Sequence, residues 1–173
     1  GSRRSGSRPK AIIMLLANRE VAFFIGGKGK DSKTFVYRIH EEPNMDKVTI
    51  LRTFVKHFGY DMSPTKNARE LSSEINKLLT TVKGRPEESA IEIMALRSMA
   101  RARYSTDNAG HYGLAFDYYT HFTSPIRRYP DMMVHRLLAL YLDKAKSQDK
   151  GYYEDRCKYS SEREQLATEA ERA

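Results

Sequence analysis

Residues 104–142 read YSTDNAGHYGLAFDYYTHFTSPIRRYPDMMVHRLLALYL, and the rest of the chain is organised around them. A strand over residues 114–120 would place Leu114, Phe116, Tyr118 and Thr120 on one face, a pattern that is typical of a half-buried β-strand. An apolar run from Asp131 to Leu142 follows, and it predicts a helix that is buried nearly all round. The sequence therefore predicts a strand, a short turn and a buried helix in succession.

The turn between strand and helix, residues 123–128, carries the signals of a helix start. Ser124 is a good N-cap, and Pro125 suits the first helical position, where its missing N–H costs nothing. Tyr129 precedes a proline and is pushed away from the α conformation. We therefore expect one short turn after Ser124 and the main helix from near Pro130.

The same turn has the composition of an anion site. Free N–H groups at a helix start, two hydroxyls and two adjacent arginines together suit phosphate. The side chains concerned are those of Thr123, Ser124, Arg127 and Arg128. By composition alone, a solvated helix start is the commoner outcome for such a turn. Both interpretations of the turn stay open at this level.

The full string resembles the signature of the ribonuclease II / ribonuclease R family of processive 3′→5′ exoribonucleases, which share the RNB catalytic domain. In that family His-Phe/Tyr-Gly-Leu is followed by Thr-Ser-Pro-Ile-Arg-Arg/Lys-Tyr and by a helix that contains His-Arg. The corresponding segments here are residues 111–114, 121–131 and 135–136. Because the agreement is long and ungapped, the resemblance implies that residues 10–173 are the C-terminal part of such a catalytic domain.

The resemblance implies hydrolysis of single-stranded RNA to nucleoside 5′-monophosphates, with Arg127 as the catalytic residue. Its guanidinium would stabilise the charge that develops on the scissile phosphate. The resemblance also implies a set of RNA or phosphate contacts from this stretch. They are Thr123, Ser124, Arg128, Tyr129, His111 and Tyr112. For the two tyrosines, core packing is the alternative to stacking on RNA bases.

Three residues elsewhere are further candidates for RNA contact, each with a structural alternative. Asn18 lies in a predicted helix that matches the family, and a core asparagine bonded to backbone is favoured over a ligand contact. Arg97, in a mostly buried predicted helix, needs an anion, and a structural carboxylate is favoured over a phosphate. Glu171 matches an Ala-Glu-Arg that the family carries near its RNA channel, but its pattern alone is that of a solvated helix residue.

The resemblance further implies Mg²⁺ ions, which the family holds with four closely spaced aspartates. This sequence has no such cluster, because Asp107, Asp117 and Asp131 are isolated from one another. Ala11 and Ile12 stand where family members usually carry two acids. We therefore expect this chain alone to hold no metal and to be inactive. The expected partners are single-stranded RNA, the N-terminal half of the catalytic domain and flanking OB-type RNA-binding domains.

The remaining pattern predicts an α+β, predominantly helical fold with about two strands and five to seven helices. Besides residues 114–120, residues 34–40 alternate in polarity and predict a strand. Residues 10–25 predict a helix that is buried on most sides and ends at a Gly-Gly pair. The other predicted helices are 45–58, with Asn44 as cap and its aromatic residues in the core, 64–82, 86–103 and 154–173. Residues 1–9 are expected to be a tag or disordered.

Composition sets outer limits on the class of protein. With 173 residues, 40% of them hydrophobic, the chain is long enough for one domain with a core. Half of the net charge of +8 comes from the first ten residues, so this charge is only weak evidence for a nucleic-acid partner. The single cysteine, Cys157, excludes an internal disulfide and fits a reducing cytoplasm. Residues 11–25 are too short and too polar to span a membrane.

Two other classes of function stay open. The first is a non-catalytic helical scaffold, derived from the same fold, that binds RNA or protein. The second is a nucleic-acid binder without hydrolysis, whose affinity for RNA would fall steeply with salt. An aspartate cluster encoded upstream in the parent gene would favour the enzyme over both.

Overall fold

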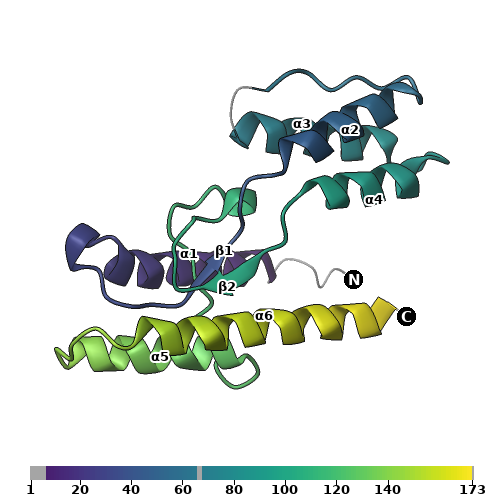
Figure 1. Cartoon of the computed structure of the whole chain (residues 1–173). Helices are drawn as coiled ribbons and strands as arrows, with labels where there is room; N and C mark the ends of the chain where they lie inside the picture. Colours follow the sequence, from purple (N-terminus) through teal and green to yellow (C-terminus); the bar gives the residue numbers. More distant parts are fainter. Residues whose placement is uncertain (1–6, 66–67, 173) are drawn as a thin grey trace. The chain divides into compact units, whose positions relative to one another are not determined.

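The computed structural model describes residues 7–65 and 68–172 (Figure 1). The described part contains six α-helices and one two-stranded sheet, so the predicted α+β, mainly helical fold is confirmed. In chain order the elements are α1 (Ser7–Gly26), the 3₁₀ turn η1 (Gly29–Asp31), β1 (Tyr37–Ile39), α2 (Met45–Lys56), α3 (Ala68–Val82), α4 (Glu88–Ser98), β2 (Arg103–Ser105), the 3₁₀ turn η2 (Tyr112–Leu114), α5 (Tyr129–Leu142) and α6 (Lys150–Arg172). Of the segment predicted as tag or disordered, residues 1–6 lie outside the described residues, and residues 7–9 belong to α1.

The chain divides into two compact units, each with its own apolar core. Within the described residues, the first unit contains 7–39, 102–111 and 116–172. The second unit contains 40–65, 68–101 and 112–115. Each unit is therefore assembled from segments that are far apart in the sequence.

The first unit is built on a short antiparallel sheet, in which Tyr37 lies opposite Ser105 and Ile39 opposite Arg103. Helix α6 packs along β2, and α5 lies beside α6 (Figure 1). Apolar side chains from these elements and from α1 meet in one cluster, which removes them from water. Its buried members are Ala22, Ile25, Phe35, Val36, Tyr37, Ile39, Tyr104, Met133, Val134, Leu137, Tyr141 and Cys157.

Helix α1 ends at Gly26, as the Gly-Gly pair predicts. A Cβ atom at Gly26 would lie 2.5 Å from the Tyr37 hydroxyl, so only glycine fits where α1 approaches β1. The prediction that this helix is buried on most sides is wrong. Ala22 is buried, but Ile13 is 66% exposed, because the N-terminal half of α1 extends away from the core cluster. Among the described residues, no helix has both the length and the apolar character of a membrane span.

The strand predicted at residues 114–120 is not formed. Instead, the chain forms η2 and an isolated bridge between His111 and Phe116. The chain thus turns back on itself, and the alternation of residue types does not correspond to two faces of a strand. Beyond this turn, the Tyr119 carbonyl accepts a hydrogen bond from the Arg38 N–H at 2.9 Å, so this segment runs beside β1 without joining the sheet.

The second predicted strand is shorter than expected, and its partner was not predicted. β1 covers only three residues of the expected range 34–40. Its partner β2 begins at Arg103, the last residue of the helix predicted at 86–103, and that helix, α4, already ends at Ser98. Strand formation depends on pairing with a distant segment, and local periodicity contains no information on that partner.

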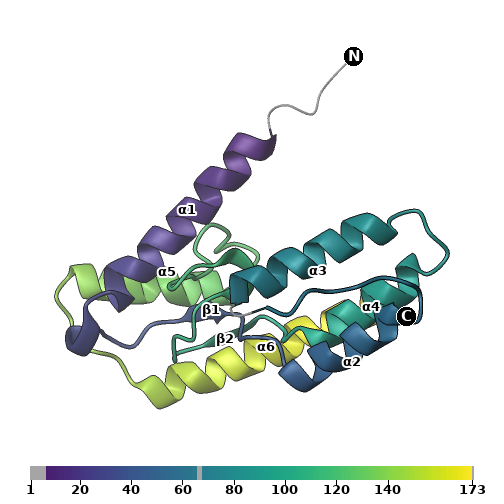
Figure 2. The same cartoon turned by 90° about the horizontal axis from the view of Figure 1, so that it is seen from above.

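The second unit is a group of three helices, in which α4 packs against both α2 and α3 (Figure 2). Asn44 caps α2 as predicted, since its Oδ1 accepts hydrogen bonds from the N–H groups of Asp46 and Lys47 at 3.0 and 3.2 Å. The prediction that the aromatic residues of this segment belong to the core is wrong for Phe58, which is 44% exposed. Phe58 lies two residues beyond Lys56, where α2 ends, so helical spacing no longer determines the direction of its side chain.

Candidate phosphate site at the start of α5

A tight turn precedes α5, as the sequence predicts. The Ser124 carbonyl accepts hydrogen bonds from the N–H of Arg127 at 3.3 Å and from the N–H of Arg128 at 3.0 Å. α5 then begins at Tyr129, with Pro130 in its first turn. The two adjacent arginines therefore lie at the junction between the turn and the helix.

The anion that this turn binds is a carboxylate of the same chain. Asp131, in the first turn of α5, is completely buried. Its Oδ2 accepts hydrogen bonds from the Ser124 N–H at 2.8 Å and from the Arg128 guanidinium at 3.0 Å. The N-cap of α5 is Arg128, whose side chain makes no cap hydrogen bond, and the Ser124 N–H at the start of the turn is bonded to Asp131. A carboxylate near the helix start stabilises the N-terminal dipole and is a stronger acceptor than a hydroxyl.

A pocket of about 230 Å³ lies beside this turn. Helix α1 supplies a mainly apolar wall, and residues 119–128 supply a polar wall with two arginines. The lining residues are Ala11, Met14, Leu15, Asn18, Tyr119, His121, Thr123, Arg127 and Arg128. Such a pocket suits a ligand that combines an anionic group with an apolar or aromatic part.

The two arginines of the pocket differ in their partners. Arg128 is partly buried and forms an ion pair with Asp131. Arg127 is exposed, and its guanidinium forms no ion pair within the described part of the chain. Next to them, Thr123 Oγ1 is buried and has no hydrogen-bond partner among the described residues, a state that a bound polar group would relieve. The Arg127 guanidinium and the Thr123 hydroxyl are therefore the groups that this pocket offers to a ligand.

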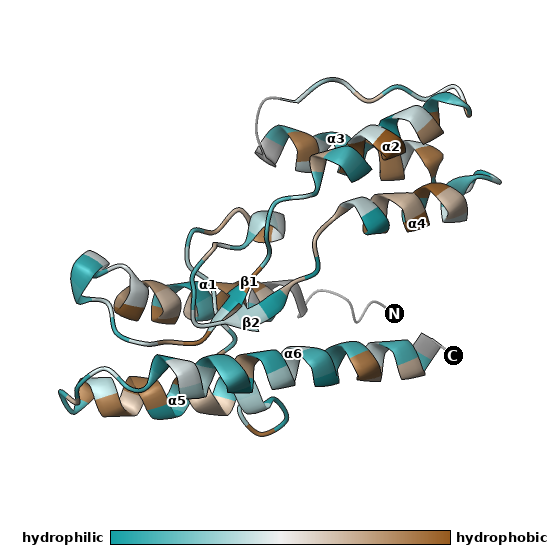
Figure 3. Cartoon of the chain, viewed as in Figure 1, coloured by the Kyte–Doolittle hydropathy of each residue, from teal (hydrophilic) through white to brown (hydrophobic). Residues whose placement is uncertain are grey.

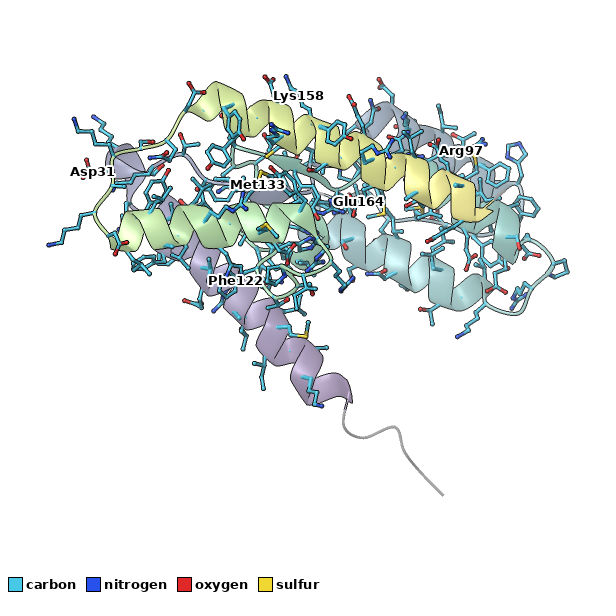
Figure 4. All side chains as sticks on the ribbon, turned by 90° about the horizontal axis from the view of Figure 1, so that it is seen from below. Asp31, Arg97, Phe122, Met133, Lys158 and Glu164 are labelled. Carbon is cyan, nitrogen blue, oxygen red and sulfur yellow. The ribbon has the colours of Figure 1, made fainter. Side chains whose placement is uncertain are left out.

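Asn18 connects the two walls of the pocket. Its side-chain amide donates to the Tyr119 hydroxyl at 3.1 Å, and its Oδ1 accepts from the Phe122 N–H at 3.0 Å. Phe122 lies between α1 and α5 (Figure 4), and its ring stacks on that of His135 with 4.1 Å between centroids. Both polar groups of the buried Asn18 are bonded inside the protein, which is the structural alternative that the sequence favours.

His121 is held in the polar wall by a network that reaches α6. The Tyr104 hydroxyl lies 2.8 Å from Nδ1 of His121, and the Arg38 guanidinium lies 4.5 Å from the centre of the Tyr104 ring. Arg38 in turn pairs with Glu164 of α6. Burial, with the positive charges of Arg128 and Arg38 as further causes, lowers the pKa of His121 to about 3. Burial also raises the pKa of Tyr104 to about 12, so both rings are neutral at pH 7 and leave the positive charge of the wall to the arginines.

Three other predicted site residues belong to the first unit but do not line the pocket. Tyr129, in the first turn of α5, is 41% exposed. His111 is partly buried, and its ring centroid lies 5.2 Å from that of Tyr119. Glu171 is exposed near the end of α6, a helix that is hydrophilic over most of its length (Figure 3).

Two predicted site residues belong to the second unit. Tyr112 lies in η2, where its N–H donates to the His40 carbonyl at 2.8 Å. Arg97 is exposed near the C-terminal end of α4. The prediction that Arg97 belongs to a mostly buried helix is wrong, because α4 buries only three of its eleven residues.

Sequence reasoning missed Asp131, His121 and Tyr119 as parts of this site. For Asp131 a local signal exists, since it follows Arg128 by three residues, the spacing at which opposite charges meet at a helix start. No local sequence pattern identifies His121 and Tyr119 as site residues, because they line a pocket only when α1 packs opposite them.

The Mg²⁺ ions that the family resemblance implies require clustered carboxylates. Within residues 7–65 and 68–172, no three His, Cys, Asp or Glu side chains lie close enough together to hold a metal ion. Asp131 is already bonded to Ser124 and Arg128. The described residues therefore do not form a magnesium site by themselves.

Residues 11–144 match the RNB domain family. The chain belongs to that family. Ribonuclease R 1 of Lactococcus lactis is 41% identical to this RNB chain over 165 residues, which cover 92% of the chain and 20% of that protein. Ribonuclease R of Aquifex aeolicus is 40% identical over 163 residues, with 92% of the chain and 22% of that protein covered. The chain thus spans about a fifth of the length of these relatives, and the resemblance predicted from the sequence is confirmed.

Solved structures share the RNB fold. Mycoplasma genitalium RNase R in complex with ribose-methylated single-stranded RNA matches with a TM-score of 0.67 and 28% identity over 88% of this chain and 24% of that chain. The same RNase R in complex with double-stranded RNA matches with a TM-score of 0.69 and 26% identity over 88% of this chain and 27% of that chain. Yeast Ssd1, a pseudonuclease, matches with a TM-score of 0.69 and 32% identity over 87% of this chain and 19% of that chain.

Proposed function

We propose that this RNB chain is the C-terminal part of the catalytic domain of a processive 3′→5′ exoribonuclease, which hydrolyses single-stranded RNA to nucleoside 5′-monophosphates. Arg127 is the catalytic residue in this proposal. The observation that carries it is the Arg127 guanidinium, which lines the pocket beside α1 and which no described carboxylate neutralises. The likeness to an RNase R solved with single-stranded RNA supports RNA as the class of ligand.

The chemistry of a guanidinium suits this role. Its planar N–H donors can meet two oxygens of one phosphate at once. As the phosphorus is attacked, negative charge grows on these oxygens, and the hydrogen bonds from Arg127 strengthen. The apolar wall from α1 lowers the local dielectric constant, which increases the electrostatic effect of the Arg127 guanidinium.

The other residues predicted from the sequence are proposed as further RNA contacts. Thr123 and Ser124 would bind backbone phosphates near the pocket, with the unpartnered Thr123 hydroxyl as the readiest donor, while Arg128 would act on the phosphate through its positive charge and keep its ion pair with Asp131. The exposed Tyr129 ring is available for stacking on a base. Further contacts are proposed for His111 and Glu171 in the first unit and for Tyr112 and Arg97 in the second, while Asn18 supports the pocket wall.

Metal binding is assigned in this proposal to the other half of the catalytic domain. The described residues supply no set of metal ligands, so their part is to hold and polarise the phosphate. The OB-type RNA-binding domains of the family would deliver the single strand. It follows that the isolated chain does not hydrolyse RNA.

Substitution of Arg127 in the full-length protein tests the catalytic role. Loss of one charge-stabilising donor lowers turnover on the order of a hundredfold or more, so Arg127→Ala should reduce kcat on labelled single-stranded RNA by about that factor. Thermal melting should be unchanged, because the side chain is exposed. Arg85→Ala, which removes an exposed arginine from the turn before α4, is the matched control and should leave kcat within about twofold. An unchanged rate with Arg127→Ala contradicts the proposal.

A second candidate is a non-catalytic scaffold that binds RNA or protein. The likeness to yeast Ssd1, a pseudonuclease, at 32% identity favours it. The full-length wild-type protein separates the two functions in the same assay with Mg²⁺. Absence of hydrolysis, together with RNA affinity that falls steeply with salt, would support a scaffold that binds RNA.

A further inference from the structure

One carboxylate oxygen bonds to both ends of the turn that carries Arg127. Oδ2 of Asp131 accepts the N–H of Ser124, the first residue of the turn, at 2.8 Å. The same oxygen accepts the guanidinium of Arg128, the last residue of the turn, at 3.0 Å. Asp131 is completely buried, so it closes the turn from the protein side.

The tip of this turn has little other support. Ile126, the neighbour of Arg127, is 100% exposed, so its side chain is not anchored in the core. The Arg127 side chain is exposed as well. The position of the tip therefore depends on the backbone hydrogen bonds to the Ser124 carbonyl and on the Asp131 carboxylate.

The same carboxylate determines which arginine is available to a ligand. Arg128 lies against both oxygens of Asp131: its Nη2 donates a hydrogen bond to Oδ2 at 3.0 Å, and its Nε is 3.0 Å from Oδ1 in an ion pair that lacks hydrogen-bond geometry. Separating a buried, two-point pair is costly, because it leaves a carboxylate without its counter-charge. Arg128 therefore stays with Asp131 when an anion enters the pocket, and Arg127 meets that anion.

We propose that Asp131 is a positioning residue of the phosphate site, which keeps residues 124–128 closed and retains Arg128 so that Arg127 approaches the scissile phosphate from a fixed backbone. This inference rests on the function proposed above. Asp131 does not touch RNA and acts only through the turn. Its loss therefore lowers the rate of the chemical step more than it weakens RNA binding, which other contacts along the strand maintain.

The full-length protein with Asp131→Asn tests this role through separate values of kcat and KM on labelled single-stranded RNA. We expect kcat to fall about tenfold or more, because a catalytic group on a loosened turn is misplaced, and KM to change by less than about threefold. Asp143→Asn, at the exposed C-cap of the same helix, is the matched control and should leave both values unchanged. A wild-type kcat with Asp131→Asn would overturn the inference.

Combination with Arg127→Ala distinguishes positioning from a general structural effect. If Asp131 acts by placing Arg127, the two substitutions are not additive. Arg127→Ala should lower kcat on the order of a hundredfold in the wild-type background but less than about tenfold in the Asp131→Asn background. An equal loss in both backgrounds would show that Asp131 does not act through Arg127.

Asp131→Asn leaves Arg128 without its partner, so the single variant can lose its fold. The double variant Arg128→Gln/Asp131→Asn removes both charges and serves as the folded comparison. A low kcat at a wild-type melting temperature supports positioning, and a wild-type kcat in this variant overturns it. An unchanged rate with Arg127→Ala would refute the proposed function itself. A loss with Arg127→Ala but none with Asp131→Asn refutes only the role of Asp131.

Discussion

Arg127 and Arg128 are adjacent, but the backbone directs their side chains to different environments. Arg128 is the N-cap of α5 and has an extended backbone with φ −125° and ψ 115°, which lets its side chain fold back on Asp131 in the first turn. Arg127 lies one residue earlier, within the turn, and its side chain is exposed. We therefore expect substitution of Arg128 to act mainly on stability and substitution of Arg127 mainly on rate.

His121 provides a prediction on pH at the residue scale. Burial, then the charges of Arg128 and Arg38, lower its pKa from 6.5 to about 3. Between these values the unfolded chain binds a proton at this residue and the folded chain does not. The contribution of His121 to the free energy of unfolding is therefore fully present above pH 6.5 and is lost progressively as the pH falls towards 3.

Urea unfolding of the wild type and of His121→Gln between pH 4 and 7 checks this sign. The stability of the wild type should fall more steeply on acidification than that of the variant, because glutamine has no proton to bind. The ring signals of His121 in NMR spectra should also show no titration near pH 6.5. Parallel pH profiles of the two proteins would contradict the lowered pKa.

At the scale of elements, the sequence predicts well the start of those helices that have a capping residue or a proline in their first turn. α2 begins after Asn44 and α5 begins at the Tyr129-Pro130 pair, as expected from cap and proline chemistry. The predicted helix at 86–103 is too long by five residues at its end, because the backbone becomes extended at Met99 and leads into β2, which begins at Arg103 and pairs with β1. A helix start depends on residues within one turn of it, whereas strand pairing depends on a segment elsewhere in the chain.

The cap of α2 gives a prediction at this scale. Asn44→Ala removes the acceptor of the Asp46 and Lys47 N–H groups and should lower the free energy of unfolding by about 1 kcal/mol. Asn44→Asp keeps an acceptor at the same position and should cost only a few tenths of that value. Urea titrations of the three proteins measure the difference. Equal losses in both variants would show that the cap itself is not responsible.

At the scale of the whole molecule, the chain is an RNB segment with large uncovered surfaces. The N-terminal half of α1 exposes Ile12, Ile13, Met14 and Leu16, and every described side chain of α6 from Glu162 to Glu171 is exposed. The chain spans about a fifth of its Ribonuclease R relatives, and its described residues lack a set of metal ligands. These observations are the reason for assigning hydrolysis to the full-length protein.

Incubation of the isolated 173-residue chain with labelled single-stranded RNA and Mg²⁺ tests this assignment. We expect no release of mononucleotides, because a phosphate held by Arg127 alone lacks an activated water. The full-length protein under the same conditions is the positive control. Processive release of mononucleotides by the isolated chain would show that the metal ligands lie within it.

The family, the cap of α2 and the tight turn before α5 can be predicted from the sequence alone, because the family motif is ungapped and the other two depend on residues within one helical turn. The fold is needed to show that α1 is largely exposed at its N-terminal half, that β1 pairs with β2 and not with the expected strand at 114–120, and that Asp131 pairs with Arg128 while Arg127 has no ion pair among the described residues. These outcomes depend on burial and on contacts between distant segments. The sequence shows which charged residues are present, but the fold determines which of them form ion pairs with one another.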